Sequence, residues 1–261
     1  GWHLAIITEE QARWKRLARG QWRDDHFGPM QVASGPPDNH RVHFEAPAAK
    51  RLDAEMQAFF DWFNADTPED PVLKAALAHL WFVTLHPFDD GNGRIARAVA
   101  EMALAKADQS GERFYSMSSL IAEDRDDYYR ILETVQNASL DVSAWMVWFW
   151  RCYDRTLDAA EVLHAKVRFK ARFWQWLNRF STNERQRLVL KRMLGDWEGP
   201  LTTSKYAKLA KCSTDTALRD ILALVKYGVL VKNEAGGRST SYRLLGPAEL
   251  STLQQSSLRV T

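Results

Sequence analysis

The feature that most constrains the fold is a proline, Pro87, that interrupts a long apolar helical pattern. Upstream, the segment PEDPVLKAALAHLWFVTLH has Asp70 as an N-cap and Pro71 at the first helical position, so a helix begins there. Pro87 disfavours helical geometry in the residue before it, so this helix must end near His86. A second helix is predicted from about residue 93 to residue 108. The break therefore places His86 at one helix end, directly before a short polar turn.

Most of the remaining pattern is also helical. Apolar residues recur at helical spacing over residues 48–64, 123–138 and 141–180. The exception precedes these helices. Apolar and polar residues alternate over residues 31–34 and 41–44, on either side of a Gly-Pro-Pro-Asp-Asn cluster, and this pattern predicts a β-hairpin. The predicted fold class is mainly α, with one small hairpin.

Length and charge divide the chain in two. A chain of 261 residues is long enough for one medium domain and a smaller one. Residues 1–182 carry 22 Lys and Arg against 26 Asp and Glu, whereas residues 183–247 carry 12 against 6, which predicts a separate basic module. The predicted domains are a core at 1–160, a linking helix at 161–182, the basic module at 183–247 and a tail at 248–261.

The composition excludes several classes of protein. There are two cysteines, Cys152 and Cys212, outside any metal-ligand spacing, which argues against a disulfide framework or a zinc site. No charged-then-apolar leader is present, and no apolar run is long enough to cross a bilayer. We expect a soluble protein of the reducing cytoplasm, with no membrane partner.

The turn LHPFDDGNGRIARA between the first two helices concentrates groups that bind phosphate. Gly91 and Gly93 allow consecutive N–H groups to curl around an anion, and the following helix adds the positive end of its dipole. Arg94 and Arg97 are three apart, so they share a helix face and can reach one polyanion. Each feature alone is more often an ordinary turn or a solvated pair, but their coincidence favours a phosphate site.

Titratable groups in the same turn extend this site to catalysis. Asp89 and Asp90 repel a phosphate unless a cation lies between them, and one carboxylate with phosphate oxygens suits Mg²⁺. His86 titrates near neutral pH and can accept a proton from a hydroxyl group. Together these groups predict phosphoryl or nucleotidyl transfer to a hydroxyl. His79, further up the first helix, is interpreted as a structural histidine.

The segment HPFDDGNGRIAR resembles the motif HxFx(D/E)GNGRxxR of the Fic family. The matched positions are His86, Phe88, Asp90, Gly91, Asn92, Gly93, Arg94 and Arg97. The resemblance covers about residues 1–160 and implies a Fic-type helical core with the hairpin as a flap. Family members mostly transfer AMP from ATP to a Ser, Thr or Tyr hydroxyl of a target protein. The related Doc-type kinases usually place Lys before the Arg, where this chain has Gly93, so AMP transfer is favoured.

The resemblance also implies a role for each matched position. It makes His86 the general base, Asp90 the ligand of Mg²⁺ and Phe88 a core anchor of the turn. Arg97 is the expected contact of the γ-phosphate. The phosphates of ATP as a whole are assigned to Gly91, Asn92, Gly93, Arg94 and Arg97.

Two further features fit the same interpretation. Tyr129 and Gln136 lie seven apart on one helix face, and similar positions in the family contact adenine; the alternative is a tyrosine that packs in the core. The hairpin at residues 30–45 can pair with an extended segment of a target protein and present its hydroxyl to His86. The alternative for the hairpin is a closed edge that binds nothing.

Fic proteins are commonly inhibited by a helix with the motif [S/T]xxxE(G/N). The chain has no complete match; the segment from Ser119 to Glu123 has the spacing but lacks the Gly or Asn, so we interpret it as chance. Because the sequence opens without Met, we expect an inhibitory helix to have preceded it and the chain to be a deregulated transferase. The alternatives are a brake on another chain, or none.

Residues 183–247 resemble a winged helix-turn-helix domain, with helices in NERQRLVLKRMLGDWEG and TTSKYAKLAKCSTDTALRDILALVKYGVL and two strands after them. If it binds DNA, the expected major-groove and phosphate contacts are Ser213, Thr214, Thr216, Arg219, Lys232 and Arg238. The alternative is a protein-docking or homodimerisation module. The predicted function is Mg-dependent AMP transfer; its rivals are a nucleotide-sensing transcriptional regulator and a Fic transferase of UMP or phosphate.

Overall fold

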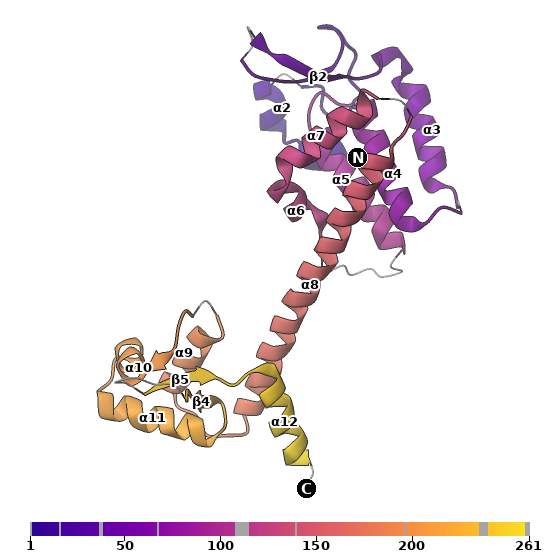
Figure 1. The fold of residues 1–261 in the computed structure, drawn as a ribbon. Coiled ribbons are helices and arrows are strands. Elements are labelled where there is room, and N and C mark those ends of the chain that lie inside the picture. The colour runs from indigo at the N-terminus through magenta and orange to yellow at the C-terminus, as the bar shows by residue number, and fades with distance from the viewer. Residues whose placement is uncertain are drawn as a thin grey trace. The chain divides into compact units, whose positions relative to one another are not determined.

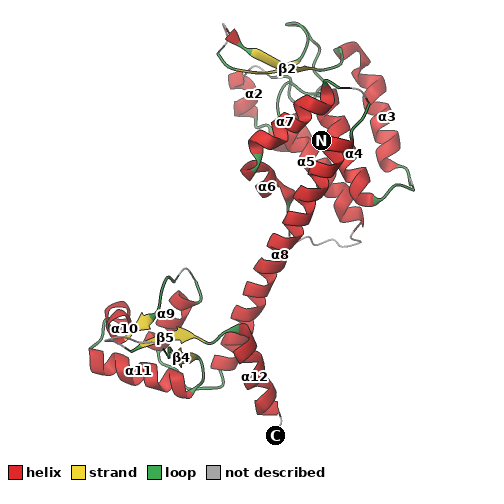
Figure 2. Cartoon of the chain, viewed as in Figure 1, coloured by secondary structure: helices red, strands yellow, loops and turns green. Residues whose placement is uncertain are grey.

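The computed structural model describes residues 2–15, 17–36, 39–66, 68–107, 115–138, 140–195, 197–234 and 240–258. The chain divides into two compact units, Gly1–Ala160 and Glu161–Thr261 (Figure 1). Helices make up most of the described residues, with short strands in both units, as the mainly helical fold class predicts (Figure 2).

The first unit is a helical core with one hairpin. In chain order its elements are α1 (Trp2–Ile6), α2 (Glu9–Lys15), β1 (Gln31–Ser34), β2 (Arg41–Glu45), the 3-10 helix η2 (Ala49–Arg51), α3 (Leu52–Asn64), α4 (Pro71–Leu85), α5 (Asn92–Ala107), α6 (Met117–Glu123), α7 (Arg125–Gln136) and the first part of α8 (Ser143–Leu177). The predicted hairpin strands and the start of α4 are confirmed: the Asp70 side chain caps α4 by accepting hydrogen bonds from Val72 and Leu73 N–H.

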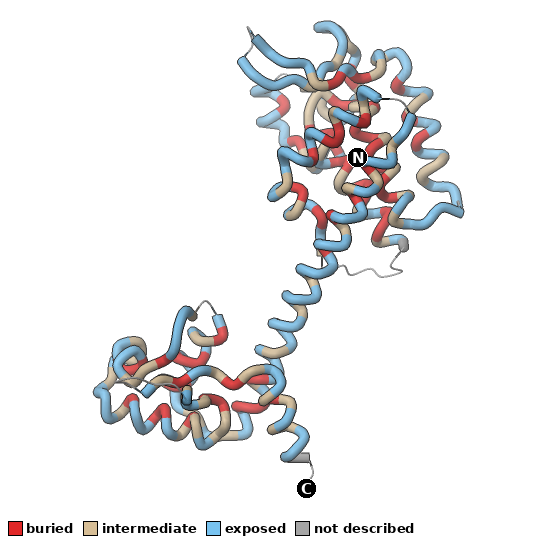
Figure 3. The backbone as a smooth tube through the Cα atoms, viewed as in Figure 1, coloured by how far each residue is buried: buried red, intermediate tan, exposed pale blue. Residues whose placement is uncertain are grey.

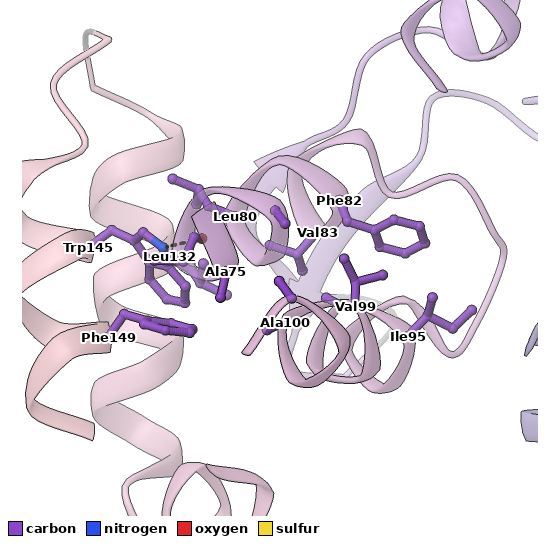
Figure 4. Close-up of a cluster of buried hydrophobic side chains, with 14 of the residues drawn as sticks. Ala75, Leu80, Phe82, Val83, Ile95, Val99, Ala100, Leu132, Trp145 and Phe149 are labelled. Carbon is purple, nitrogen blue, oxygen red and sulfur yellow. Dashed lines mark hydrogen bonds between the residues drawn. The ribbon is translucent and has the colours of Figure 1, made fainter. Parts of the chain in front are cut away.

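Helix α4 is the centre of this core. Small side chains at Ala75, Ala76 and Ala78 are fully buried, so neighbouring helices approach α4 closely. In Figure 4, Val99 and Ala100 of α5 lie against α4, and Trp145 and Phe149 of α8 lie on another side of it. The Trp145 indole also donates a hydrogen bond of 2.9 Å to the Ala76 carbonyl. Burial of each large apolar side chain here contributes about 1.5–3 kcal/mol, so this packing stabilises the position of α4 in the core.

The hairpin is fastened to α7 by polar contacts. Its antiparallel register pairs Gln31 with Glu45 and Ser34 with Arg41, with an irregularity between Val32 and Ala33. Glu133 of α7 binds Arg41 at 2.5 Å, and the side chain of Asn137, the C-cap of α7, donates to the His43 carbonyl at 2.7 Å. Within the described part of the hairpin, these hydrogen bonds come from β2, and β1 pairs with β2, so β1 is the outer strand.

The second unit has its own hydrophobic core. It contains the rest of α8, then α9 (Glu184–Met193), β3 (Leu201–Thr202), α10 (Thr203–Ala210), α11 (Thr214–Lys226), β4 (Leu230–Lys232), β5 (Ser241–Leu244) and α12 (Pro247–Leu258). The strands form an antiparallel sheet in the order β3-β5-β4. Buried residues of this core appear as red segments on the inner sides of its helices and strands (Figure 3). The winged-helix assignment stays a prediction.

Two features of this unit differ from the sequence pattern. The stretch from residue 161 to residue 177 is more than a link, because Phe173 and Leu177 are fully buried in the core of the second unit. Residues 247–258 form α12 where a tail is predicted, and Leu250 is buried. Within the described ranges, none of the helices combines the length and the apolar character that a membrane span requires.

The second unit contains a buried carboxylate with several donors. Asp220 of α11 accepts hydrogen bonds from Arg185 Nε at 2.9 Å, Asn183 Nδ2 at 2.8 Å and the Tyr206 hydroxyl at 3.1 Å. Burial by itself raises the pKa of Asp220, but the hydrogen bonds from Arg185, Asn183 and Tyr206 outweigh it and hold the pKa below its ordinary value. The ionised carboxylate therefore ties α9, α10 and α11 together.

We expect Asp220→Asn to destabilise the second unit by about 1–3 kcal/mol at pH 7, because its donors lose a charged acceptor. The folded-state pKa lies below the unfolded one, so this stabilisation is present above about pH 4 and is lost as the pH falls through the lowered pKa. Urea unfolding at pH 7 and pH 3 tests this: the difference in the free energy of unfolding between the variant and wild type should be smaller at pH 3. Glu234→Gln, at an exposed position, is the control; an equal difference at both pH values contradicts the prediction.

Candidate functional site

The turn between α4 and α5 holds His86 in an unusual backbone conformation. His86 caps α4 with φ 48° and ψ 54°, in the left-handed region that non-glycine residues rarely adopt. Its Nδ1 donates to the Val83 carbonyl at 3.2 Å, so in the neutral ring Nε2 is left with a lone pair. Burial lowers the pKa of His86; the bond to Val83 opposes this, and the charge of Arg23 lowers the pKa further against the opposing effect of Asp90. The imidazole is therefore a neutral acceptor at neutral pH.

Arg23 holds this turn from a distant part of the chain. Its side chain is 1% exposed and donates from Nε to the His86 carbonyl at 2.8 Å and from Nη2 to the Leu85 carbonyl at 3.4 Å. The same guanidinium binds the Pro47 carbonyl and the Asp25 carboxylate. The carbonyls of Leu85 and His86 lie at the end of the helix, and both accept hydrogen bonds from Arg23. These bonds stabilise the left-handed conformation of His86.

Asn92 braces the turn from the other end. Its side chain is buried and closes a ring with Phe88: Oδ1 accepts from Phe88 N–H at 3.0 Å and Nδ2 donates to the Phe88 carbonyl at 2.6 Å. The amide is committed to these two bonds, so what Asn92 offers to a ligand is its backbone N–H. Its predicted contact with the phosphates of ATP therefore concerns the main chain.

The N-terminus of α5 faces a cavity. Gly91 has φ 88°, a conformation that favours glycine, and Gly91, Asn92 and Gly93 all line the cavity. The first N–H groups of a helix lack intrahelical acceptors and carry the positive end of the dipole. This wall can therefore bind an anion.

The two arginines of the motif point in different directions. Arg97 lines the cavity, beside Gly93. Arg94 does not line it: its Nη1 donates to the Ile6 carbonyl of α1 at 3.2 Å, and its Nη2 lies 3.9 Å from Asp90 Oδ1. The sequence predicts that both bind one polyanion, but the structure brings only Arg97 to the cavity wall.

Asp90 is ionised and already paired with a cation. Lys15 Nζ of α2 lies 2.6 Å from Asp90 Oδ2. This hydrogen bond from Lys15 lowers the pKa of Asp90; burial opposes it, and Gly91 N–H and Arg94 lower the pKa further. The described residues contain no group of three His, Cys, Asp or Glu side chains that could hold a metal ion. A charged oxygen beside an anion-binding helix end nevertheless suits Mg²⁺ that shares its ligands with phosphate, provided that Lys15 moves away.

His3 supports Asp90 from the N-terminal segment. Its Nδ1 accepts from Gly20 N–H at 2.8 Å, so its Nε2 carries the proton and donates to the Asp90 carbonyl at 3.2 Å. The His3 ring also stacks on Phe88 with 4.1 Å between ring centroids. The turn is therefore packed against α1 through His3, which does not line the cavity.

The cavity has a volume of about 550 Å³ and is enclosed by the hairpin, the α4–α5 turn and α7. Both predicted adenine contacts line it. Tyr129 is 48% exposed, with the Arg125 guanidinium 5.5 Å from the centre of its ring, and Gln136 donates to the Thr84 hydroxyl at 3.1 Å. The cavity thus joins a half-exposed aromatic ring, an anion-binding helix end and the His86 turn.

His79 is structural, as predicted. It is fully buried, and its Nε2 lies 3.0 Å from the hydroxyl of Tyr128, which lines the cavity. Burial, with a contribution from Arg97, lowers the pKa of His79 to about 3. The ring therefore stays neutral and cannot serve as a titrating base near neutral pH.

Sequence reasoning missed His3, Lys15 and Arg23. All three come from the N-terminal segment, where no periodic pattern indicates a function, and they meet the turn only through the fold. The adjacent Tyr128 was missed as well, although Tyr129 was predicted. Tyr128 directly precedes Tyr129, the predicted adenine contact, and this pair of tyrosines was the available signal.

We expect Arg23→Ala to destabilise the first unit by about 3 kcal/mol, because it leaves the Asp25 charge and the turn carbonyls without their buried donor. Urea unfolding of the full chain measures the change. Arg13→Ala, at an exposed position of α2, is the matched control and should change stability by less than about 0.5 kcal/mol. Equal stability of the two variants contradicts the role assigned to Arg23.

Comparison with known proteins gives consistent matches to Fic proteins. The model of the Fic/DOC family matches residues 2–104. A protein named Protein adenylyltransferase Fic from Nematostella vectensis is 36% identical over 115 residues, which covers 43% of this chain and 25% of that protein. One of the same name from Drosophila willistoni is 32% identical over 114 residues, covering 43% and 21%. The chain therefore spans about a quarter of the length of these curated relatives.

A solved structure supports the fold. The crystal structure of a Fic family protein from Desulfovibrio desulfuricans G20 aligns with a TM-score of 0.50 at 18% identity, over 91% of this chain and 66% of that one. The motif of the α4–α5 turn lies within the segment that the family model matches. Residues 2–104 therefore match the Fic/DOC family, and the chain contains a Fic domain.

Proposed function

We propose that this chain transfers AMP from ATP to a Ser, Thr or Tyr hydroxyl of a target protein. The observation that carries the proposal is the position of His86: its turn lines the same cavity as the N-terminus of α5, with Nε2 left as an acceptor. The curated relatives of this chain are named adenylyltransferases, which supports this class of reaction.

The chemistry follows from the cavity walls. The phosphates of ATP lie at Gly91, Gly93 and the main chain of Asn92, with Arg97 binding the far end of the triphosphate. Adenine lies against Tyr129 and Gln136. His86 Nε2 takes the proton of the target hydroxyl, whose oxygen attacks the α-phosphorus as pyrophosphate leaves.

The expected metal is Mg²⁺ at Asp90. When bound with ATP, Mg²⁺ neutralises phosphate charge and helps to orient the triphosphate. Asp90 presents an ionised oxygen beside the phosphate wall, and Asp89, whose Oδ2 accepts from Ala18 N–H at 3.0 Å, lines the same cavity. Lys15 competes with the metal for Asp90.

The target protein docks on the hairpin. Strand β1 pairs with β2 alone in the described part of the chain, so its other edge offers unpaired main-chain groups. An extended target segment can pair there and reach the cavity that the same strand lines. Deregulated transferase activity and a cytoplasmic location remain predictions from the sequence.

The exposed surface of the second unit favours a protein partner over DNA. Ser213 caps α11, and its hydroxyl accepts from Thr216 N–H at 3.2 Å; Arg238 lies outside the described residues. The exposed face of α11 also carries Leu218 and Leu222, at 41% and 52% exposure. These apolar side chains favour contact with protein over DNA. DNA binding that survives loss of His86 is the outcome that favours the regulator alternative.

We expect His86→Ala to reduce AMP transfer by about 10²- to 10⁴-fold, because the target hydroxyl loses its proton acceptor. Intact-protein mass spectrometry after incubation with ATP, Mg²⁺ and cell lysate measures the gain in mass. His26→Ala, at an exposed position, is the control. A gain equal to phosphate or UMP, or equal transfer by His86→Ala, contradicts the proposal.

We expect Lys15→Ala to lower the Mg²⁺ concentration at half-maximal activity by about 2- to 5-fold. The salt bridge to Asp90 is partly exposed, so its loss frees the carboxylate at a gain of no more than about 1 kcal/mol. Titration of the transfer rate with Mg²⁺ measures this, and Lys50→Ala, at an exposed position, is the control. An unchanged or higher Mg²⁺ requirement contradicts competition at Asp90.

A further inference from the structure

A second hydroxyl and histidine lie in the same cavity, on the hairpin. Ser34 Oγ is 2.6 Å from His43 Nε2, and His43 Nδ1 is 2.9 Å from Glu133 Oε2. All three residues line the cavity that contains Gly91, Gly93 and the His86 turn. The Fic motif includes none of the three, and the proposed transfer to a target assigns them no role.

The direction of these hydrogen bonds follows from their acceptors. An ionised carboxylate can only accept, so Nδ1 of His43 must donate its hydrogen to Glu133. The hydrogen bond from His43 is the main cause that lowers the pKa of Glu133, and Arg41 adds to it, which keeps this carboxylate ionised. In neutral His43, Nε2 is therefore the acceptor and the Ser34 hydroxyl is the donor. A hydroxyl, a base and a carboxylate that orients the base are the elements of an activated nucleophile.

Attachment of the hairpin does not account for this arrangement. Arg41 and Asn137 already connect β2 to α7. Ser34 belongs to β1 and is exposed, so its hydroxyl makes no contribution to that attachment and remains accessible from the cavity. The bond to His43 instead places the oxygen of Ser34 beside a proton acceptor.

We propose that Ser34 is an acceptor of AMP from ATP bound in the same cavity, with His43 as its general base. This inference rests on the proposed function. The oxygen of Ser34 forms a bond to the α-phosphorus, the bond from that phosphorus to the oxygen bridging to the β-phosphate breaks, and pyrophosphate leaves. The proton of the hydroxyl passes to His43 Nε2, while Glu133 stabilises the charge on the ring.

The shared cavity makes the reaction intramolecular. Ser34 and the cavity wall at Gly91 and Gly93 belong to one unit of one chain. The first-order rate constant of labelling is therefore independent of protein concentration. The AMP attached to Ser34 then occupies the cavity and excludes a further ATP. One round of self-labelling therefore reduces transfer to other proteins.

The test uses the full chain with Mg²⁺ and ATP that is labelled in its α-phosphate, followed by peptide mapping. Wild type should gain one AMP on the peptide with Ser34, at a rate constant unchanged over a tenfold range of protein concentration. Ser34→Ala should lose this label and Ser34→Thr should retain it. His43→Gln should slow labelling by about 10²- to 10⁴-fold. Ser119→Ala, at an exposed serine outside the cavity, is the matched control.

Contrary outcomes separate the two proposals. His86-dependent labelling of lysate proteins without label on Ser34 overturns this inference alone. Label on Ser34 with a rate that rises with protein concentration, or with an unchanged rate in a folded His43→Gln variant, overturns the intramolecular reaction through His43. No AMP transfer to any protein overturns both proposals. Thermal unfolding of each variant confirms that it is folded.

Discussion

The geometry of the site depends on the contact between the Arg23 guanidinium and the carbonyls that end α4. A helix that stops at a left-handed non-glycine residue has a strained conformation and exposed acceptors. Arg23 binds the carbonyls of Leu85 and His86, and Asp25 balances its charge. The orientation of the His86 ring follows, because the same turn allows Nδ1 to reach the Val83 carbonyl. A long-range contact with one buried cation thus fixes the tautomer of His86.

On the other side of the turn, the charge of Asp90 is compensated by cationic side chains of the same chain. Lys15 and Arg94 both lie near Asp90, and Arg94 also donates to α1. The proposed ATP and Mg²⁺ compete with these ion pairs for the same charged groups. Partly exposed ion pairs exchange at low cost, on the order of 1 kcal/mol or less. The salt bridges therefore compensate the charge of Asp90 without preventing the proposed binding of a ligand.

The sequence predicts the parts of this site that depend on local signals. Asp70, Pro71 and Pro87 determine where α4 begins and ends, and this places His86 and the glycine turn correctly. The contacts that support the turn could not be predicted, because Lys15 and Arg23 are far away in the chain and follow no periodic pattern. Spacing alone also does not predict the contacts of Arg94 and Arg97. They share a helix face, but Arg94 donates to a carbonyl of α1 and Arg97 lines the cavity. Helix α12 was missed for a similar reason, since its burial at Leu250 depends on tertiary packing.

Three histidines near the cavity illustrate how the environment decides what one residue type does. His79 is buried among aromatic rings, where the charged form is unstable, so it is confined to packing and a bond to Tyr128. His86 has a carbonyl as the partner of Nδ1, which fixes its tautomer and stabilises a positive ring less than a carboxylate does. His43 has the carboxylate of Glu133 in that place. A base paired with a carboxylate suits an acceptor fixed in the protein, whereas a base held by main-chain atoms leaves its outer nitrogen free for a hydroxyl that arrives with a partner.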